Sequence, residues 1–242
     1  GLTVSFVAAR STYAQDATNI ADQVTIVPAS PDFHFARKVV GADGATAGPA
    51  AERLVYSNTL GKFAVSLGPD RLVADDISIN APNGCNLRRY EFPVVGKVDP
   101  AGIGGPYSVQ FALYDNCPGA VPSAIRPALI IPGTQDQAVF ADDAPRLISF
   151  VVPQGVDVHI PTNVWLGVKF SRNNAGVMVG APALVGFTSD SFDYPGFSCN
   201  ANLGGFPAQP HASFNVELFV DADCPEAVLG YRANKPSGNV YN

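Results

Sequence analysis

Three stretches of the chain alternate strictly between apolar and polar residues. They run over 107–115, Asn163–Phe170 and 213–220. A period of two places neighbouring side chains on opposite faces of a β-strand, so each stretch predicts a strand with one buried and one wetter face. The residues predicted to face the core are Tyr107, Val109, Phe111, Leu113, Val164, Leu166, Val168, Phe170, Phe214, Val216, Leu218 and Val220.

Further stretches with a less regular pattern also favour strands, whereas no stretch of ten or more residues carries the apolar stripe of a helix. The 23 glycines and 21 prolines among 242 residues suit turns between short strands, because neither residue is stable inside a helix. We therefore expect an all-β fold, a two-sheet antiparallel sandwich of jelly-roll type with an extended N-terminal arm; a barrel is the alternative. The additional strands are expected at 71–79, 87–95, 146–152, 156–160, 177–179 and 183–188.

The beginning of the chain predicts an arm and a linker rather than part of a core. Two β-like runs, 2–8 and 23–27, are followed by a spacer at 41–51 that contains no large side chain. A spacer of this composition is flexible or extended. The expected organisation is an arm and linker over 1–51, a sandwich domain over 52–224 and a C-terminal tail over 225–242.

Leu2, Val4 and Phe6 in this arm alternate with polar residues, which is the pattern of a strand with one apolar face. Such a strand needs a sheet to cover it, and strand addition to the edge of a neighbouring subunit would supply one. We expect residues 1–27 to pair with a neighbouring copy of the chain rather than to complete their own domain.

Val55-Tyr-Ser-Asn58, Val73-Ala-Asp-Asp-Ile77 and the strands at 107–115 and Asn163–Phe170 together resemble a type of secreted bacterial β-sandwich. Such domains are similar to the jelly rolls of carbohydrate-binding modules and of surface proteins. The resemblance spans residues 53–221. It implies an extracellular accessory or structural domain and does not imply a particular ligand.

Charged residues make up only 15% of the chain, and the formal net charge is −6. No cluster of lysine and arginine is present, which argues against nucleic acid and anionic membrane surfaces as partners. No apolar run reaches the roughly 18 residues that a membrane-spanning helix needs.

The four cysteines, Cys85, Cys117, Cys199 and Cys224, show no CxxC or Cys/His spacing, so two disulfides are favoured over zinc or over four reduced thiols. If 86–96 and 107–115 form a symmetric hairpin, Cys85 faces Cys117, and Cys199 bonds Cys224 by exclusion. Disulfides indicate an oxidising compartment, and Ser11-Thr-Tyr-Ala-Gln15 resembles the end of a secretory signal. We therefore expect an extracellular or cell-surface location.

Asp75 and Asp76 lie inside an apolar predicted strand, where one of the two side chains must face the core side. A buried carboxylate is costly unless a partner neutralises it. Calcium, with Asp221 and Asp223 as further ligands, or a basic residue such as Arg71 would provide that partner. The alternative is that these aspartates cap turns or lie in solvent.

Aromatic residues form the last candidate site. Trp165 is out of phase with the core residues of its strand, and the long turn-rich segment 189–207 holds four more aromatics. Long segments without regular structure are uncommon unless they are functional. Packing on the domain itself, a subunit interface and a sugar site all remain open for this set, which comprises Trp165, Phe192, Tyr194, Phe197 and Phe206.

We find no GxSxG, HExxH or phosphate-loop motif, and the four glutamates show no spacing that suggests an acid/base pair. The sequence therefore predicts a non-enzymatic protein. The favoured function is an extracellular structural subunit that self-assembles into a filament or surface layer, by addition of the N-terminal strand to a neighbouring copy. The alternative is a carbohydrate-binding or adhesive jelly-roll module whose partner is a polysaccharide.

Overall fold

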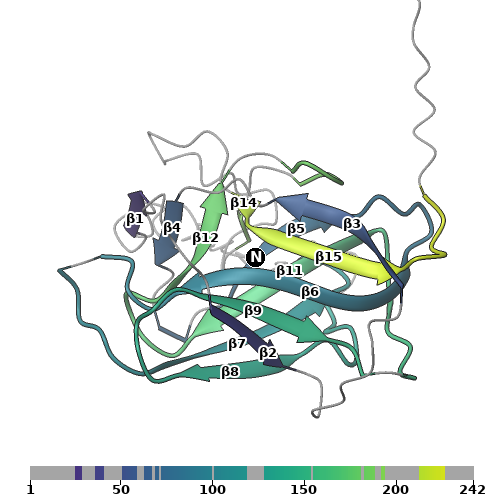
Figure 1. Ribbon diagram of the computed structural model, residues 1–242. Helices are drawn as coiled ribbons and strands as arrows, with labels where there is room; N and C mark the ends of the chain where they lie inside the picture. Colours follow the sequence, from purple (N-terminus) through teal and green to yellow (C-terminus); the bar gives the residue numbers. More distant parts are fainter. Residues whose placement is uncertain are drawn as a thin grey trace, which may run out of the picture.

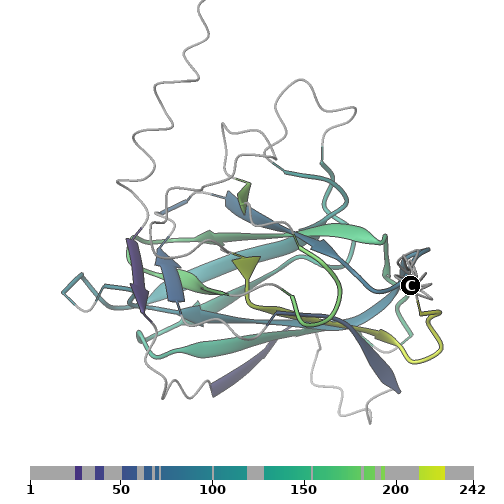
Figure 2. The same cartoon turned by 90° about the horizontal axis from the view of Figure 1, so that it is seen from above.

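The computed structural model describes residues 25–28, 36–40, 51–58, 63–66, 69–70, 72–99, 101–118, 128–153, 155–180, 183–188, 192–193 and 213–226. In these ranges the regular elements are all β-strands, and they form two sheets that pack against each other. Figures 1 and 2 together show the two layers, with β6, β9 and β15 in the layer nearer to the viewer of Figure 1. The predicted all-β sandwich is confirmed, and the jelly-roll type stays a prediction.

The larger sheet is organised around β6 (Cys85–Val95), its longest strand. Its main path runs β1 (Thr25–Pro28), β4 (Phe63–Ser66), β12 (Gly176–Gly180), β6, β15 (Val216–Asp221) and β3 (Glu52–Asn58). Beside this path, β9 (Arg146–Val151) and β10 (His159–Ile160) pair with β6, and β14 (Ser213–Phe214) pairs with β12. All of these pairs are antiparallel, whereas β2 (Ala36–Val40) pairs with β9 in parallel.

The smaller sheet is antiparallel throughout. Its order is β13 (Phe192–Asp193), β5 (Leu72–Ser78), β11 (Asn163–Phe170), β7 (Tyr107–Tyr114) and β8 (Asp136–Phe140). Two of the three strands with strict alternation, β7 and β11, are therefore direct neighbours in this sheet.

The core lies between the sheets and contains every residue that alternation predicted to face inward. The twelve side chains predicted from the three strictest stretches are all at most 3% exposed. An aromatic cluster joins the sheets, since Phe111 of β7 makes edge contacts with Tyr90, Phe92 and Phe150 of the larger sheet at centroid distances of 5.2 to 6.3 Å. The Tyr90 hydroxyl donates a hydrogen bond to the Thr134 carbonyl at 2.5 Å, which satisfies its buried polar group.

Two strands lie inside the stretch that the sequence assigned to an arm. β1 pairs with β4, and β2 pairs with β9, so both belong to the larger sheet of their own chain. The expected pairing with a neighbouring copy is therefore wrong for Thr25–Val27. Leu2, Val4 and Phe6 lie outside the described residues, and the boundary between residues 51 and 52 stays a prediction.

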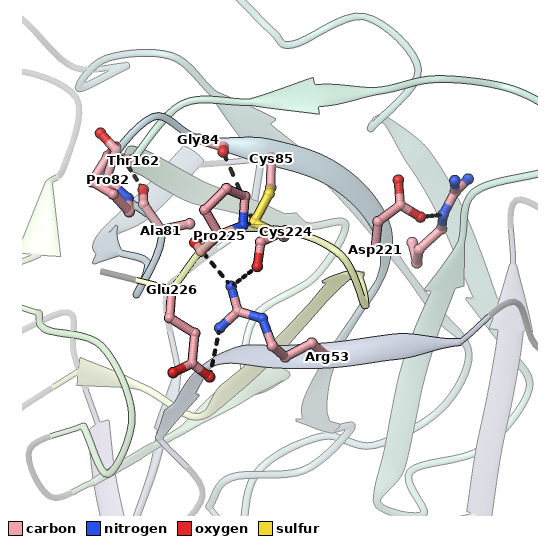
Figure 3. The surroundings of a disulfide bond; sticks show 11 residues. Arg53, Ala81, Pro82, Gly84, Cys85, Thr162, Asp221, Cys224, Pro225 and Glu226 are labelled. Carbon is pink, nitrogen blue, oxygen red and sulfur yellow. Dashed lines mark hydrogen bonds and ion pairs between the residues drawn. A yellow bond between two sulfur atoms is a disulfide. The ribbon is translucent and has the colours of Figure 1, made fainter. Parts of the chain in front are cut away.

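The predicted Cys85–Cys117 and Cys199–Cys224 pairings are both wrong, because Cys85 is bonded to Cys224. The prediction assumed that β6 and β7 form a hairpin, but they lie in different sheets. The bond joins the start of β6 to the turn after β15, with Cα atoms 6.0 Å apart (Figure 3). Cys117 is also disulfide-bonded, and Cys199 lies outside the described residues.

The disulfide is buried and braced by Arg53 of β3. One Arg53 nitrogen donates to the carbonyl of Cys224 at 3.0 Å and to that of Pro225 at 3.3 Å. Figure 3 also shows the ion pair between Arg53 and Glu226, at 3.6 Å.

The described residues contain no helix that is long and apolar enough to cross a membrane.

Candidate functional site

The outer face of the smaller sheet carries the side chains that alternate with the core residues, and strand register arranges them in rows across the strands. Lys169 of β11 lies opposite Leu72 of β5 and Gln110 of β7. Gln110 in turn lies opposite Gln137 of β8. Directly opposed residues of antiparallel strands share a face, so these four residues form one mostly polar row.

The next row along β11 consists of small residues. Gly167 lies opposite Ala74 of β5 and Ala112 of β7. The row after it is aromatic and acidic, since Trp165 lies opposite Asp76 of β5 and Tyr114 of β7. A strip of small side chains therefore separates a polar row from an aromatic one.

A groove of about 550 Å³ lies over this part of the sheet. Its volume falls in the range of about 300–1,000 Å³ that is typical of small-molecule sites. It is lined by Leu72, Gln110, Phe111, Ala112, Tyr114, Ile130, Gln135, Asp136, Gln137, Gly167 and Lys169.

The ring of Tyr114 lies against the sheet above Gly167. A Cβ atom at residue 167 would be 2.5 Å from Cε2 of Tyr114 and 3.1 Å from Cδ1 of Leu72. The absence of a side chain at Gly167 thus allows the ring to approach the sheet closely at this point. Burial raises the pKa of the Tyr114 phenol above its usual value, so the hydroxyl stays protonated at neutral pH and can donate a hydrogen bond.

The hydrogen bond and the ion pair described for the polar side chains of the groove are both weak. Gln110 and Gln137 are exposed, and the amide nitrogen of Gln110 lies 3.5 Å from the carbonyl oxygen of Gln137, at the limit of a hydrogen bond. Lys169 lies 3.8 Å from Asp70, whose side chain is 74% exposed. An ion pair this exposed contributes little, so the ammonium group can bind a ligand.

The groove is lined by one acidic residue, Asp136, and one basic residue, Lys169, so their formal charges cancel. The remaining polar groups are the amides of Gln110, Gln135 and Gln137 and the phenol of Tyr114. Each amide both donates and accepts hydrogen bonds. The groove is therefore suited to an uncharged ligand that is rich in hydroxyl groups and has an apolar face.

Trp165 lies on the outer face, opposite the core, as alternation predicted. Its role in binding stays a prediction. Tyr194, Phe197 and Phe206 lie outside the described residues, and of Phe192 the structure describes only the backbone.

The four aspartates expected to bind calcium do not form one group: Asp75 and Asp76 lie on β5 of the smaller sheet, whereas Asp221 ends β15 of the larger sheet and Asp223 follows it. Asp75 is fully buried and accepts a hydrogen bond from the backbone N–H of Phe214 at 2.6 Å, whereas Asp76 faces outward beside Trp165. Asp221 belongs to the larger sheet and pairs with Arg88. Within the described ranges, no three Asp, Glu, His or Cys side chains are grouped so that they could hold a metal ion. Arg71 lies outside these ranges.

The sequence interpretation missed Tyr114, Gln110, Lys169 and Gly167. The signal was present, because all four occupy the phase of β7 and β11 that points away from the core. Alternation along one strand does not tell which residue of the neighbouring strand lies opposite each residue.

Comparisons of the chain with protein-family models, with curated proteins and with solved structures found no match.

Proposed function

We propose that this protein is a carbohydrate-binding module that holds a neutral polysaccharide on the outer face of the smaller sheet. The observation that carries the proposal is the groove itself, in which the Tyr114 ring packs over Gly167 and a row of amides lines the same hollow. This is the function that the sequence interpretation held as its alternative.

A pyranose ring presents C–H groups on its faces and hydroxyl groups around its edge. The Tyr114 ring offers an apolar surface against which such a face can stack. The amides of Gln110, Gln135 and Gln137 can exchange hydrogen bonds with the hydroxyls in either direction. A ligand that lacked these hydroxyls would leave polar groups unpaired, so the site would discriminate against purely apolar molecules.

Isothermal titration calorimetry with neutral oligosaccharides tests the proposal. Tyr114→Ala and Gln110→Ala should each weaken binding by about tenfold, which corresponds to about 1.4 kcal/mol. Ser108→Ala is the matched control, because Ser108 lies on the same strand and the same face but outside the groove. Unchanged affinity in both groove variants, or absence of sugar binding by the wild type, would contradict the proposal.

The second candidate is the self-assembling structural subunit, in which Leu2, Val4 and Phe6 would add a strand to a neighbouring copy. The observation that favours it is β8, which ends the smaller sheet in the described part of the chain and exposes 64% of Val139. An edge strand presents unpaired N–H and C=O groups that can accept another strand. Replacing Leu2, Val4 and Phe6 together by serine should abolish assembly in sedimentation velocity, and Thr3→Ala with Ser5→Ala should not.

Both candidates place the protein outside the cell or on its surface. The Cys85–Cys224 disulfide supports this location, because structural disulfides persist mainly in oxidising compartments.

A further inference from the structure

A further aromatic residue extends the outer face beyond the groove. Phe187 exchanges two backbone hydrogen bonds with Ser78 of β5, at 2.7 and 2.9 Å. Such a pair is antiparallel, so the two side chains lie on the same face. Ser78 lies opposite Asn163 and donates a hydrogen bond to its side chain at 2.6 Å, which identifies this face as the outer one.

Phe187 therefore occupies the row next to that of Trp165 and Tyr114. Its side chain is 65% exposed, a high value for a phenylalanine that lies beside a regular sheet. Strands in a sheet are about 4.8 Å apart, and residues two apart along a strand are separated by about 6.8 Å. Phe187 and Tyr114 are separated by three inter-strand spacings across the sheet and by one two-residue step along the strands. The three aromatic residues therefore span about 16 Å diagonally across the sheet.

We propose that the ligand is an internal stretch of an extended, neutral β-linked hexose chain, which runs from Phe187 over Trp165 to Tyr114 and into the groove. This inference rests on the proposed function and specifies its ligand. Three aromatic residues on one sheet face form a track longer than a single sugar ring, so a monosaccharide would leave most of it uncovered.

The chemistry of the track selects among polysaccharides. Asp136 and Lys169 balance each other in the groove, and the track also passes the carboxyl group of Asp76 beside Trp165, which together disfavour a polyanionic chain. An extended β-linked chain presents its rings along a nearly straight ribbon and can contact all three aromatic residues at once. A coiled α-linked chain curves away from a sheet face after one or two contacts. Because Phe187, at the end of the track away from the groove, is largely exposed, the track does not require a free chain end there.

The test measures how affinity depends on chain length. Calorimetry would use β-1,4-linked glucose and mannose oligosaccharides of two, four and six units, with α-1,4-linked glucose oligosaccharides of equal length for comparison. Wild-type affinity for at least one β-linked series should rise by about tenfold or more from two to six units. Phe187→Ala should remove most of that gain and leave the affinity for two units unchanged, whereas Tyr114→Ala should weaken binding at every length.

Leu184→Ala is the matched control, because Leu184 is 58% exposed in the same loop but its backbone N–H bonds to Ser57 of β3. Circular dichroism would establish that each variant is folded. Affinity that does not depend on length, equal length dependence for the α-linked series, or a six-unit affinity unaffected by Phe187→Ala would each overturn the inference while leaving the proposed function intact. If no oligosaccharide binds, the proposed function and this inference both fail. If Phe187→Ala instead dissociates an oligomer of the protein, the outer face is a protein interface.

Discussion

The ring of Tyr114 occupies the space that a side chain at residue 167 would fill, since a Cβ atom there would lie 2.5 Å from Cε2 of the ring. The two residues lie on neighbouring strands of the smaller sheet, β7 and β11. Real Cβ atoms almost never make contacts shorter than 3.0 Å, so a larger residue at this position must displace the ring or its surroundings. Gly167 thereby sets the shape of the groove without needing to bond a ligand itself.

Gly167→Ala should therefore lift the Tyr114 ring off the sheet and lower oligosaccharide affinity by about tenfold. The fold should be retained, because alanine is compatible with a strand and the displaced ring lies at the surface. A structural readout is independent of any ligand: the burial that raises the pKa of Tyr114 would decrease, so that pKa should move back toward its usual value in an ultraviolet titration. An unchanged tyrosine titration would contradict this account of Gly167.

Replacing Asp143 should show a pH-dependent loss of stability. Arg172 bonds the Asp143 carboxylate at 2.5 Å and also the carbonyl oxygens of Gly96 and Gly105, which ties three loops together at one end of the sandwich. Burial by itself raises the pKa of Asp143, but the hydrogen bonds from Arg172 and from the Gly105 N–H outweigh it and hold the pKa below its usual 3.8.

A carboxylate whose pKa is lower in the folded state stabilises the fold above its unfolded pKa, and this contribution is lost as the pH falls through the folded value. Asp143→Asn should therefore cost about 1–2 kcal/mol at pH 7 in urea unfolding, and the difference from wild type should shrink below about pH 4. Asp142→Asn is the control, because Asp142 is 60% exposed and its ion pair with Arg146 should contribute less than about 1 kcal/mol. A deficit that is equal at pH 3 and pH 7 would exclude the ionic explanation.

Arg89 should be important for the stability of the larger sheet. Its guanidinium forms ion pairs with Glu52 and with Glu91 and stacks 3.4 Å from the centroid of the Phe219 ring. The Glu91 side chain is only 4% exposed, so removing Arg89 would take one ion-pair partner away from a buried carboxylate. Arg89→Ala should destabilise the protein by about 3 kcal/mol or more in chemical denaturation.

Arg88→Ala provides the comparison for Arg89, because Arg88 pairs with Asp221, which is 20% exposed and can regain contact with water. We expect the Arg88 variant to lose less than half as much stability. Equal losses in the two variants would show that burial of Glu91 is not the deciding factor.

The Cys85–Cys224 disulfide closes a sequence separation of 139 residues, so the chain-entropy model assigns it about 5 kcal/mol of stability. Replacing both cysteines by alanine should lower the unfolding midpoint accordingly. Peptide mapping under non-reducing conditions should recover Cys85 linked to Cys224, and a Cys85–Cys117 peptide would contradict the structure.

The register between strands shows which part of the site the sequence could predict. The outward direction of Trp165 follows from its own strand, because its neighbours Val164 and Leu166 are apolar and face the core. That Trp165 stands beside Tyr114 and Asp76 does not follow, because the partners of β11 are more than 40 residues away along the chain. The groove exists only once those partners are in register.

The rest of the molecule shows the same contrast between features set by the local sequence pattern and features set by contacts between distant segments. Alternation along the chain by itself determined that the protein is all-β, where its strictest strands lie and which of their side chains are buried, because side-chain direction repeats every two residues within one strand. Only the tertiary structure decided that β6 and β7 lie in different sheets, that Cys85 therefore meets Cys224, and that β1 and β2 join their own sandwich. Sheet assignment and register depend on contacts between distant segments, and the local pattern of a strand is compatible with many partners.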